Sequence, residues 1–94
     1  TGKRTSTGPF VVYALQARQE DIRMTVVISK KVDKRAAVRN RCRRRVREAF
    51  RPLVSDLKPS FDILVYIKQD MGSVEFEKVS QDLTEGCRRL GLFR

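Results

Sequence analysis

The residues best suited to chemistry lie in one arginine-rich stretch, residues 37–50, which read AVRNRCRRRVREAF. Guanidinium groups form paired hydrogen bonds with phosphate and stack on nucleobases, so such a cluster is suited to a polyanion. Residues 30–51 hold 11 Lys/Arg and two Asp/Glu, a net charge of +9, whereas the rest of the chain contributes only +1. This concentration of charge favours nucleic acid as the partner and RNA only weakly over DNA. A membrane surface is the weaker alternative, because the stretch has no Trp and only one aromatic residue, Phe50.

Apolar residues at helical spacing run through the same stretch and predict an amphipathic helix. The apolar set is Val38, Cys42, Val46, Ala49, Phe50 and Leu53. Asp33 is the candidate N-cap, and Pro52 is expected to end or kink the helix. The opposite face of the helical wheel carries Asn40, Arg44, Arg47 and Arg51, with Arg43 beside them and Arg39 at the border. A solvated face without a partner is the competing interpretation, but like charges three and four residues apart destabilise a helix, which favours a polyanionic partner.

A self-contained nuclease would need an acid, a base or a metal site, and the sequence offers no such group. Histidine is absent, and the 11 carboxylates are scattered along the chain. Cys42 and Cys87 lie within apolar patterns, which argues against a zinc site and against a disulfide. We therefore predict no catalytic residue and no metal ligand in the protein. We also expect a reducing, cytoplasmic compartment, and no membrane partner, because no apolar run approaches the roughly 20 residues of a membrane span.

The remaining pattern predicts one α+β domain over residues 1–94. Residues 1–9 are small, polar and basic, and are expected to form a lead-in loop. Strands are expected at 10–17, 23–30 and 61–68, which are rich in β-branched and aromatic residues. A second amphipathic helix is indicated at the end of the chain by Phe76, Val79, Leu83, Cys87 and Leu90.

The order of these elements, β-β-α-β-α, predicts a two-layer α/β sandwich with the helices on one face of a small mixed sheet. The short charged connection after 10–17 predicts that this strand pairs antiparallel with 23–30. The strands before and after the arginine helix are expected to be parallel and joined by a crossover, and 61–68 is apolar enough to be central.

Two features of the sequence match a known family. The residues SKK at 29–31, followed by AVRNRCRRRVREAF, resemble the RNR signature of the bacterial ribonuclease P protein family, and FVVY at 10–13 and FDILVYIK at 61–68 fall where that family places strands. The resemblance implies the left-handed β-α-β crossover of the ribosomal protein S5 domain 2-like fold. It also implies an RNA-binding subunit of the ribonucleoprotein that removes the 5′ leader of precursor tRNA. The catalytic RNA and the Mg²⁺ that it binds would carry the chemistry.

The resemblance also assigns binding residues. Those expected to bind the catalytic RNA are Lys30, Lys31, Arg39, Asn40, Arg41, Arg43, Arg44, Arg47 and Arg51. Those expected to bind the single-stranded leader in a cleft on the sheet are Val11, Tyr13, Val27 and Lys31. Ordinary packing is the alternative role for Tyr13.

The sequence departs from the family in two places. The family normally begins with a basic helix that closes one wall of the cleft, whereas this chain is expected to lack that helix or to have lost it. The segment VDKRAAV, residues 32–38, places Asp33 where Gly is usual, which is expected to alter the start of the helix. The alternative functions are a generic basic RNA- or DNA-binding module, such as a ribosomal protein, and, least favoured, an independent hydrolase.

Overall fold

The computed structural model describes residues 2–17, 21–69, 71 and 74–94 of the chain. Within these residues the elements follow the order β1 (Lys3–Thr7), β2 (Phe10–Gln16), β3 (Arg23–Ile28), α1 (Ala36–Phe50), the 3₁₀ helix η1 (Arg51–Asp56), β4 (Phe61–Ile67) and α2 (Phe76–Arg89).

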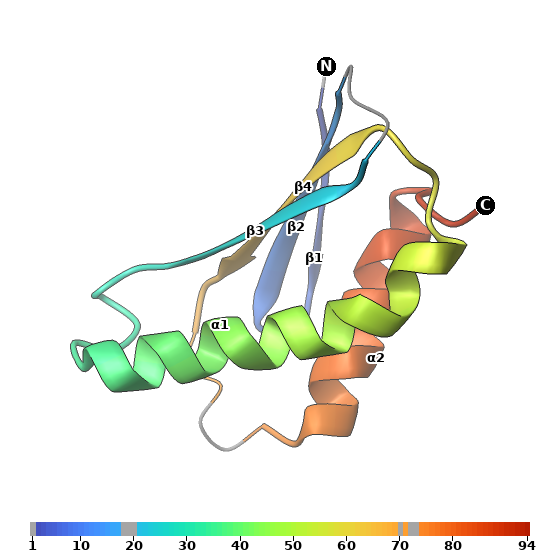
Figure 1. Cartoon of the computed structure of the whole chain (residues 1–94). Helices are drawn as coiled ribbons and strands as arrows, with labels where there is room; N and C mark the ends of the chain where they lie inside the picture. Colours follow the sequence, from blue (N-terminus) through green and yellow to red (C-terminus); the bar gives the residue numbers. More distant parts are fainter. Residues whose placement is uncertain (1, 18–20, 70, 72–73) are drawn as a thin grey trace.

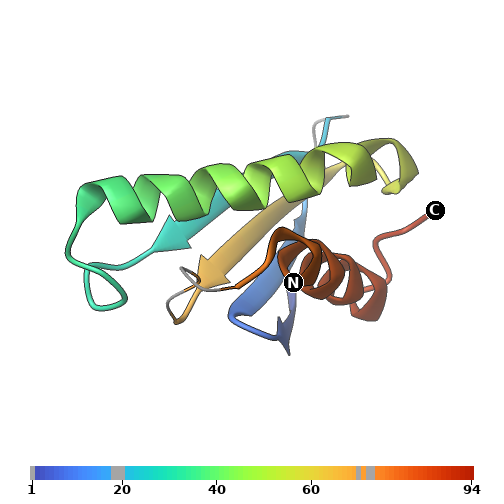
Figure 2. The same cartoon turned by 90° about the horizontal axis from the view of Figure 1, so that it is seen from below.

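The four strands form one mixed sheet in the order β1-β2-β4-β3. β2 is antiparallel to both β1 and β4, whereas β3 is parallel to β4. Both helices lie on the same face of this sheet (Figure 1). α1 packs against β3 and α2, and α2 packs against β1 and β2 (Figure 2). The predicted two-layer α+β architecture, the central position of β4 and the parallel pair around α1 are confirmed.

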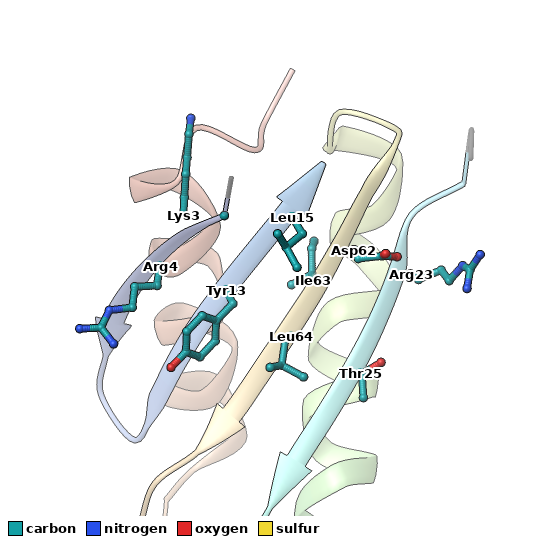
Figure 3. A pocket seen from close by; sticks show the side chains of 10 residues that line it. Lys3, Arg4, Tyr13, Leu15, Arg23, Thr25, Asp62, Ile63 and Leu64 are labelled. Atoms are coloured by element: carbon teal, nitrogen blue, oxygen red, sulfur yellow. The ribbon is translucent and has the colours of Figure 1, made fainter. Parts of the chain in front are cut away.

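The crossover from β3 through α1 to β4 is left-handed, as the family resemblance implied. Figure 3 looks onto the sheet face that carries neither of the described helices, which we call the open face. In this view β3 and β4 both run downwards, β3 lies to the right of β4, and α1 lies behind them. A connection that passes behind the sheet and moves to the left in this view is left-handed, against the strong general preference for right-handed crossovers.

The expected lead-in loop at residues 1–9 is wrong, because Lys3–Thr7 forms strand β1 and pairs with β2. β1 stands at the edge of the sheet, and only its last residue, Thr7, is buried. Charged residues protect an edge strand from pairing with other chains, and they also remove the apolar alternation by which a strand is detected in a sequence.

The predicted pairing of β2 with β3 is also wrong, because β4 lies between them. The core face of β4 is wholly apolar, and its residues Ile63, Val65 and Ile67 are all at most 2% exposed. Burying this strand in the interior of the sheet removes more apolar surface from water than leaving it at an edge. The connection from β2 to β3 can span two strand spacings of about 4.8 Å each, and part of it, residues 18–20, lies outside the described residues.

The arginine-rich segment forms the predicted amphipathic helix. Cys42, Val46, Ala49 and Phe50 are buried, and Val38 is half-buried and packs against the core. α1 ends at Phe50 and continues as η1, with proline in the first turn of the 3₁₀ helix, as predicted from Pro52.

Asp33 is not the N-cap of α1, so that prediction is wrong. The helix begins at Ala36 with Arg35 at the N-cap position. The Asp33 carboxylate instead accepts hydrogen bonds from the Arg35 backbone N–H (2.8 Å) and from the Arg35 guanidinium (3.0 and 3.1 Å). In α2, the predicted face is buried except for Phe76, which stands at the first residue of the helix and is 45% exposed.

The β1–β2 hairpin and α2 approach each other closely at Gly8. The Thr7 hydroxyl donates a buried hydrogen bond to the Asp82 backbone carbonyl (2.8 Å). Gly8 has a φ of 55°, and a Cβ atom at this position would lie 2.1 Å from Asp82 Oδ2. Glycine therefore meets two requirements here, a left-handed backbone and the absence of a side chain.

We predict that Gly8→Ala destabilises the protein more than Gly91→Ala does. Gly91 has a similar φ of 69°, but nothing lies within 4 Å of its missing Cβ atom. Gly91→Ala should lower the free energy of unfolding by about 1–2 kcal/mol, the cost of a left-handed alanine, and Gly8→Ala by more. Urea unfolding of both variants measures the difference, and equal losses would mean that Asp82 moves aside at no cost.

Candidate nucleic-acid interface

The solvent face of α1 and its C-terminal end present guanidinium groups that are not used by the fold. Arg41, Arg44, Arg47 and Arg51 are all exposed. Within the described part of the chain, no hydrogen bond or ion pair engages these four guanidinium groups, and none engages the neighbouring Glu48 carboxylate. The buried opposite face fixes the backbone of the helix and keeps these side chains close to one another, and no acidic partner among the described residues offsets their mutual repulsion.

Two other predicted residues of the helix are partly used in the protein itself. The Arg39 guanidinium donates to the backbone carbonyls of Asp33 (3.0 Å) and Lys34 (2.9 Å). This contact ties the start of α1 to the preceding loop and accounts for the half-buried state of Arg39. The Arg43 guanidinium donates to Asn40 Oδ1 (2.9 Å), so these two side chains orient each other on the surface of the helix.

Arg45, which was not among the predicted binding residues, is bound within the fold. Its guanidinium donates to the Met71 carbonyl (2.9 Å) and to the Val74 carbonyl. Both carbonyls belong to the segment between β4 and α2, so Arg45 fixes α1 to the start of the second helix. One arginine of the run is thereby structural, and its position beside the apolar stripe, three residues after Cys42, is the sequence signal that separates it from Arg44.

The loop 29–35 between β3 and α1 carries the two predicted basic residues Lys30 and Lys31, which are both exposed. Its acidic residue, Asp33, forms an ion pair with Arg35 (3.0 Å). Hydrogen bonds from the Arg35 side chain and backbone hold the pKa of the Asp33 carboxyl below its ordinary value. Asp33 is therefore ionised at neutral pH and neutralised locally, and Lys30 and Lys31 form no ion pair within the part of the chain that the structure describes.

A second candidate surface is a groove of about 570 Å³ on the open face of the sheet (Figure 3). Its apolar floor includes Tyr13, Leu15 and Leu64, and Leu15 is 52% exposed. Its other lining residues include Lys3, Arg4, Arg23 and Asp62. An apolar floor with several cations beside it can accept a flat ring and hold an adjacent anion.

The structure places three of the four predicted leader residues on the open face. Tyr13 is half-buried and lines the groove. Val11 and Val27 lie one row further along the sheet, on either side of Tyr66, because the register pairs both valines with that residue. Lys31 does not line the groove. The start of β3 lines the groove, and Lys31 follows the other end of that strand.

Several residues of the open face were not predicted. Leu64 and Tyr66 alternate along β4 with buried residues, so the period of two could have assigned them to a common face. It could not show that this face carries no helix. Arg4 was missed because its segment was expected to be a loop, although the register places it opposite Tyr13.

The described residues offer no protein-borne metal site. Among them, no three His, Cys, Asp or Glu side chains lie close enough together to hold a metal ion. Cys42 and Cys87 are both buried without a disulfide, and burial raises the pKa of the Cys87 thiol to about 11. None of the helices in the described part of the chain is sufficiently long and apolar to span a membrane.

Comparison with known proteins identifies similar sequences across almost the whole chain. The family model described as Ribonuclease P matches residues 1–91. The ribonuclease P protein component of Bacillus velezensis is 32% identical over 94 residues, which cover 99% of this chain and 79% of that protein. The ribonuclease P protein component of Geobacillus kaustophilus is 32% identical over 91 residues, which cover 96% of this chain and 74% of that protein.

Solved structures share the fold as well. The RNase P protein from Thermotoga maritima, in complex with 1-(4-fluorophenyl)-2-thiourea, superposes with a TM-score of 0.80 at 28% identity, over 89% of this chain and 81% of that chain. A Staphylococcus aureus RNase P protein mutant with defective mRNA degradation activity superposes with a TM-score of 0.85 at 25% identity, over 98% of this chain and 77% of that chain.

We predict that the adjacent variants Arg44→Ala and Arg45→Ala separate an exposed arginine from a structural one. Arg45→Ala removes two charge-assisted hydrogen bonds to backbone carbonyls and should lower the free energy of unfolding by about 1–2 kcal/mol. Arg44→Ala makes the same change in helix propensity but removes no contact within the fold. Its free energy of unfolding should therefore stay within about 0.5 kcal/mol of the parent's value. Urea unfolding measures both, and equal stabilities would show that the Arg45 contacts contribute nothing.

Proposed function

The chain belongs to the ribonuclease P protein family, and on this premise we propose that it binds two RNA segments as the protein subunit of that ribonucleoprotein. The solvent face of α1 binds the catalytic RNA, and the groove on the open face binds the single-stranded 5′ leader of precursor tRNA. The observation that carries the proposal is the unused guanidinium groups on a helix whose other face is fixed in the core.

The arginine face supplies the electrostatic part of the proposed interaction. Arg41, Arg44 and Arg47 project from a helix that is docked on the sheet, so binding requires ordering of their side chains but not of the backbone. Contact with phosphates would replace the repulsion among these residues with ion pairs and release counterions from the RNA. Lys30 and Lys31 extend this charge onto the loop before the helix.

The groove is suited to an unpaired strand. Tyr13 presents a half-buried ring beside the exposed side chain of Leu15. A base of an unpaired segment can turn outwards and stack on such a ring, whereas the bases of a duplex are stacked on one another. Lys3, Arg4 and Arg23 line the same groove, and we propose that their side chains neutralise phosphates of the bound strand.

The catalytic chemistry is proposed to belong to the RNA partner and its Mg²⁺, acting in the cytoplasm. Magnesium sites combine carboxylates with substrate phosphates, and no group of three potential metal ligands is present among the residues that the structure describes. Asp33 and Asp82 are instead paired with Arg35 and Lys78. In this proposal the protein binds the catalytic RNA and positions the leader of the precursor tRNA.

We predict that Arg44→Ala and Arg47→Ala each weaken binding of the matched catalytic RNA. Each loss of a phosphate contact should lower the slope of log K against log salt concentration by about one. Arg45→Ala is the matched control and should leave the slope unchanged. Unchanged slopes in all three variants would mean that these arginines do not contact the RNA backbone, and equal affinity for an unrelated RNA of the same length would favour a generic basic module.

We predict that Tyr13→Ala weakens binding of leader-bearing precursor tRNA by about 1–3 kcal/mol, the usual contribution of one stacked base. Mature tRNA, which has no leader, should be affected little, and Tyr13→Phe should bind like the parent because the ring is retained. Affinities of the reconstituted ribonucleoprotein for both tRNAs measure the effect. Equal losses for the two tRNAs would contradict a leader groove.

A further inference from the structure

The loop between β3 and α1 places an acidic residue, Asp33, within a basic surface. Asp33 follows Lys31 by two residues, in the stretch 30–51 that holds 11 Lys/Arg and only two Asp/Glu. A carboxylate repels the phosphates of RNA, so its place in this surface calls for a physical reason. Resting on the proposed contact of Lys30 and Lys31 with the catalytic RNA, we infer that Asp33 is a positioning residue, which holds the loop in the shape that presents these two lysines.

The Asp33 carboxylate is engaged by the loop itself. Only 10% of its side-chain surface is exposed. Its oxygens accept hydrogen bonds from the Arg35 backbone N–H (2.8 Å) and from the Arg35 guanidinium (3.0 and 3.1 Å). A bond from an Asp side chain to the N–H two residues later is an Asx turn, which fixes the backbone between the two residues. Arg39 Nη1 holds the same segment from α1, because it donates to the backbone carbonyls of Asp33 (3.0 Å) and Lys34 (2.9 Å).

The two lysines lie in a turn that this segment anchors. The Val32 backbone N–H donates to the Ser29 carbonyl (3.1 Å), so Lys30 and Lys31 occupy the two central positions of the turn. Val32 packs against the core, and Asp33 comes next in the chain. The turn is therefore attached to the core at Val32 and to the start of α1 through Asp33 (Figure 1). A loop that is already ordered avoids the entropy cost of ordering when RNA binds.

The sign of the effect separates this role from simple electrostatics. If Asp33 acted on RNA through its charge alone, removal of the charge would strengthen binding, because a repulsion of phosphate would be lost. If Asp33 positions the lysines, loss of its hydrogen bonds weakens binding. Asp33→Asn and Asp33→Ala make the same change in charge, but the asparagine side-chain oxygen can still accept from the Arg35 N–H and alanine cannot. The comparison of these two variants therefore isolates the turn from the charge.

The test is the affinity of both variants for the matched catalytic RNA at one salt concentration. Asp33→Ala should bind about two- to tenfold more weakly than Asp33→Asn, which corresponds to the usual cost of ordering one side chain. Asp33→Asn should bind at least as tightly as the parent, and Asp33→Ser, whose hydroxyl accepts the same bond more weakly, should fall between the two. Equal affinities of the three variants would overturn the positioning role.

Amide hydrogen exchange of the Val32 N–H tests the same role without RNA. This amide closes the lysine turn, so it should exchange faster in Asp33→Ala than in Asp33→Asn. Equal exchange rates would show that Asp33 does not hold the turn. Urea unfolding of both variants confirms that the fold is retained, and the parent chain is the reference for both measurements.

A background that lacks both lysines shows whether Asp33 acts through them. In a chain with Lys30→Ala and Lys31→Ala, the difference between Asp33→Asn and Asp33→Ala should disappear. A difference that persists would overturn the positioning role. If the lysine changes leave the affinity and its salt slope unchanged, the proposed lysine contact is wrong and the positioning role falls with it, whereas the arginine face of α1 is judged separately by Arg44→Ala.

Discussion

The structure depends on the docking of one narrow apolar stripe of α1 against the sheet. Four buried residues, Cys42, Val46, Ala49 and Phe50, attach a helix that otherwise consists mostly of charge. Burial of these side chains must outweigh the repulsion among neighbouring arginines, because the nearby carboxylate, Glu48, forms no ion pair among the described residues. The docked helix therefore carries a dense array of cations, and a bound polyanion would reduce the repulsion among them.

The arginines of this helix differ in what they contact, and the difference follows from their angle around the helix axis. Arg39 and Arg45 lie on the two flanks of the apolar stripe, where they reach backbone carbonyls of the preceding loop and of the segment before α2. Arg44 and Arg47 point away from the sheet and reach solvent. A half-buried guanidinium that satisfies backbone acceptors stabilises the fold, so similar residues in one run divide between arginines bound within the fold and arginines exposed to solvent.

The sheet separates two surfaces of different character. Its inner face is covered by both helices, and its outer face exposes a groove and a row of partly accessible apolar residues. The proposed partner of each surface is RNA, but the physical basis differs. The helix offers fixed charge for a folded backbone, and the open face offers rings for unpaired bases. The loop 29–35 joins them, because it leads from the end of β3 into α1.

The sequence by itself determined the elements whose signals are local. The period of the apolar residues identified both helices and the strands β2, β3 and β4, and Pro52 marked the end of α1, because side-chain direction follows backbone geometry over a few residues. It also identified the family, through a run of arginines with fixed spacing. Local signals failed at β1, whose charged edge residues lack alternation. They also failed at Asp33, which lies three residues before the first residue of α1 and whose carboxylate binds Arg35. Tertiary structure alone decided that β4 lies between β2 and β3, that Arg45 binds the segment before α2, and that Tyr13 and Tyr66 share an uncovered face. Each of these depends on contacts between segments far apart in the chain, and the burial that favours them is a property of the assembled sheet and helices.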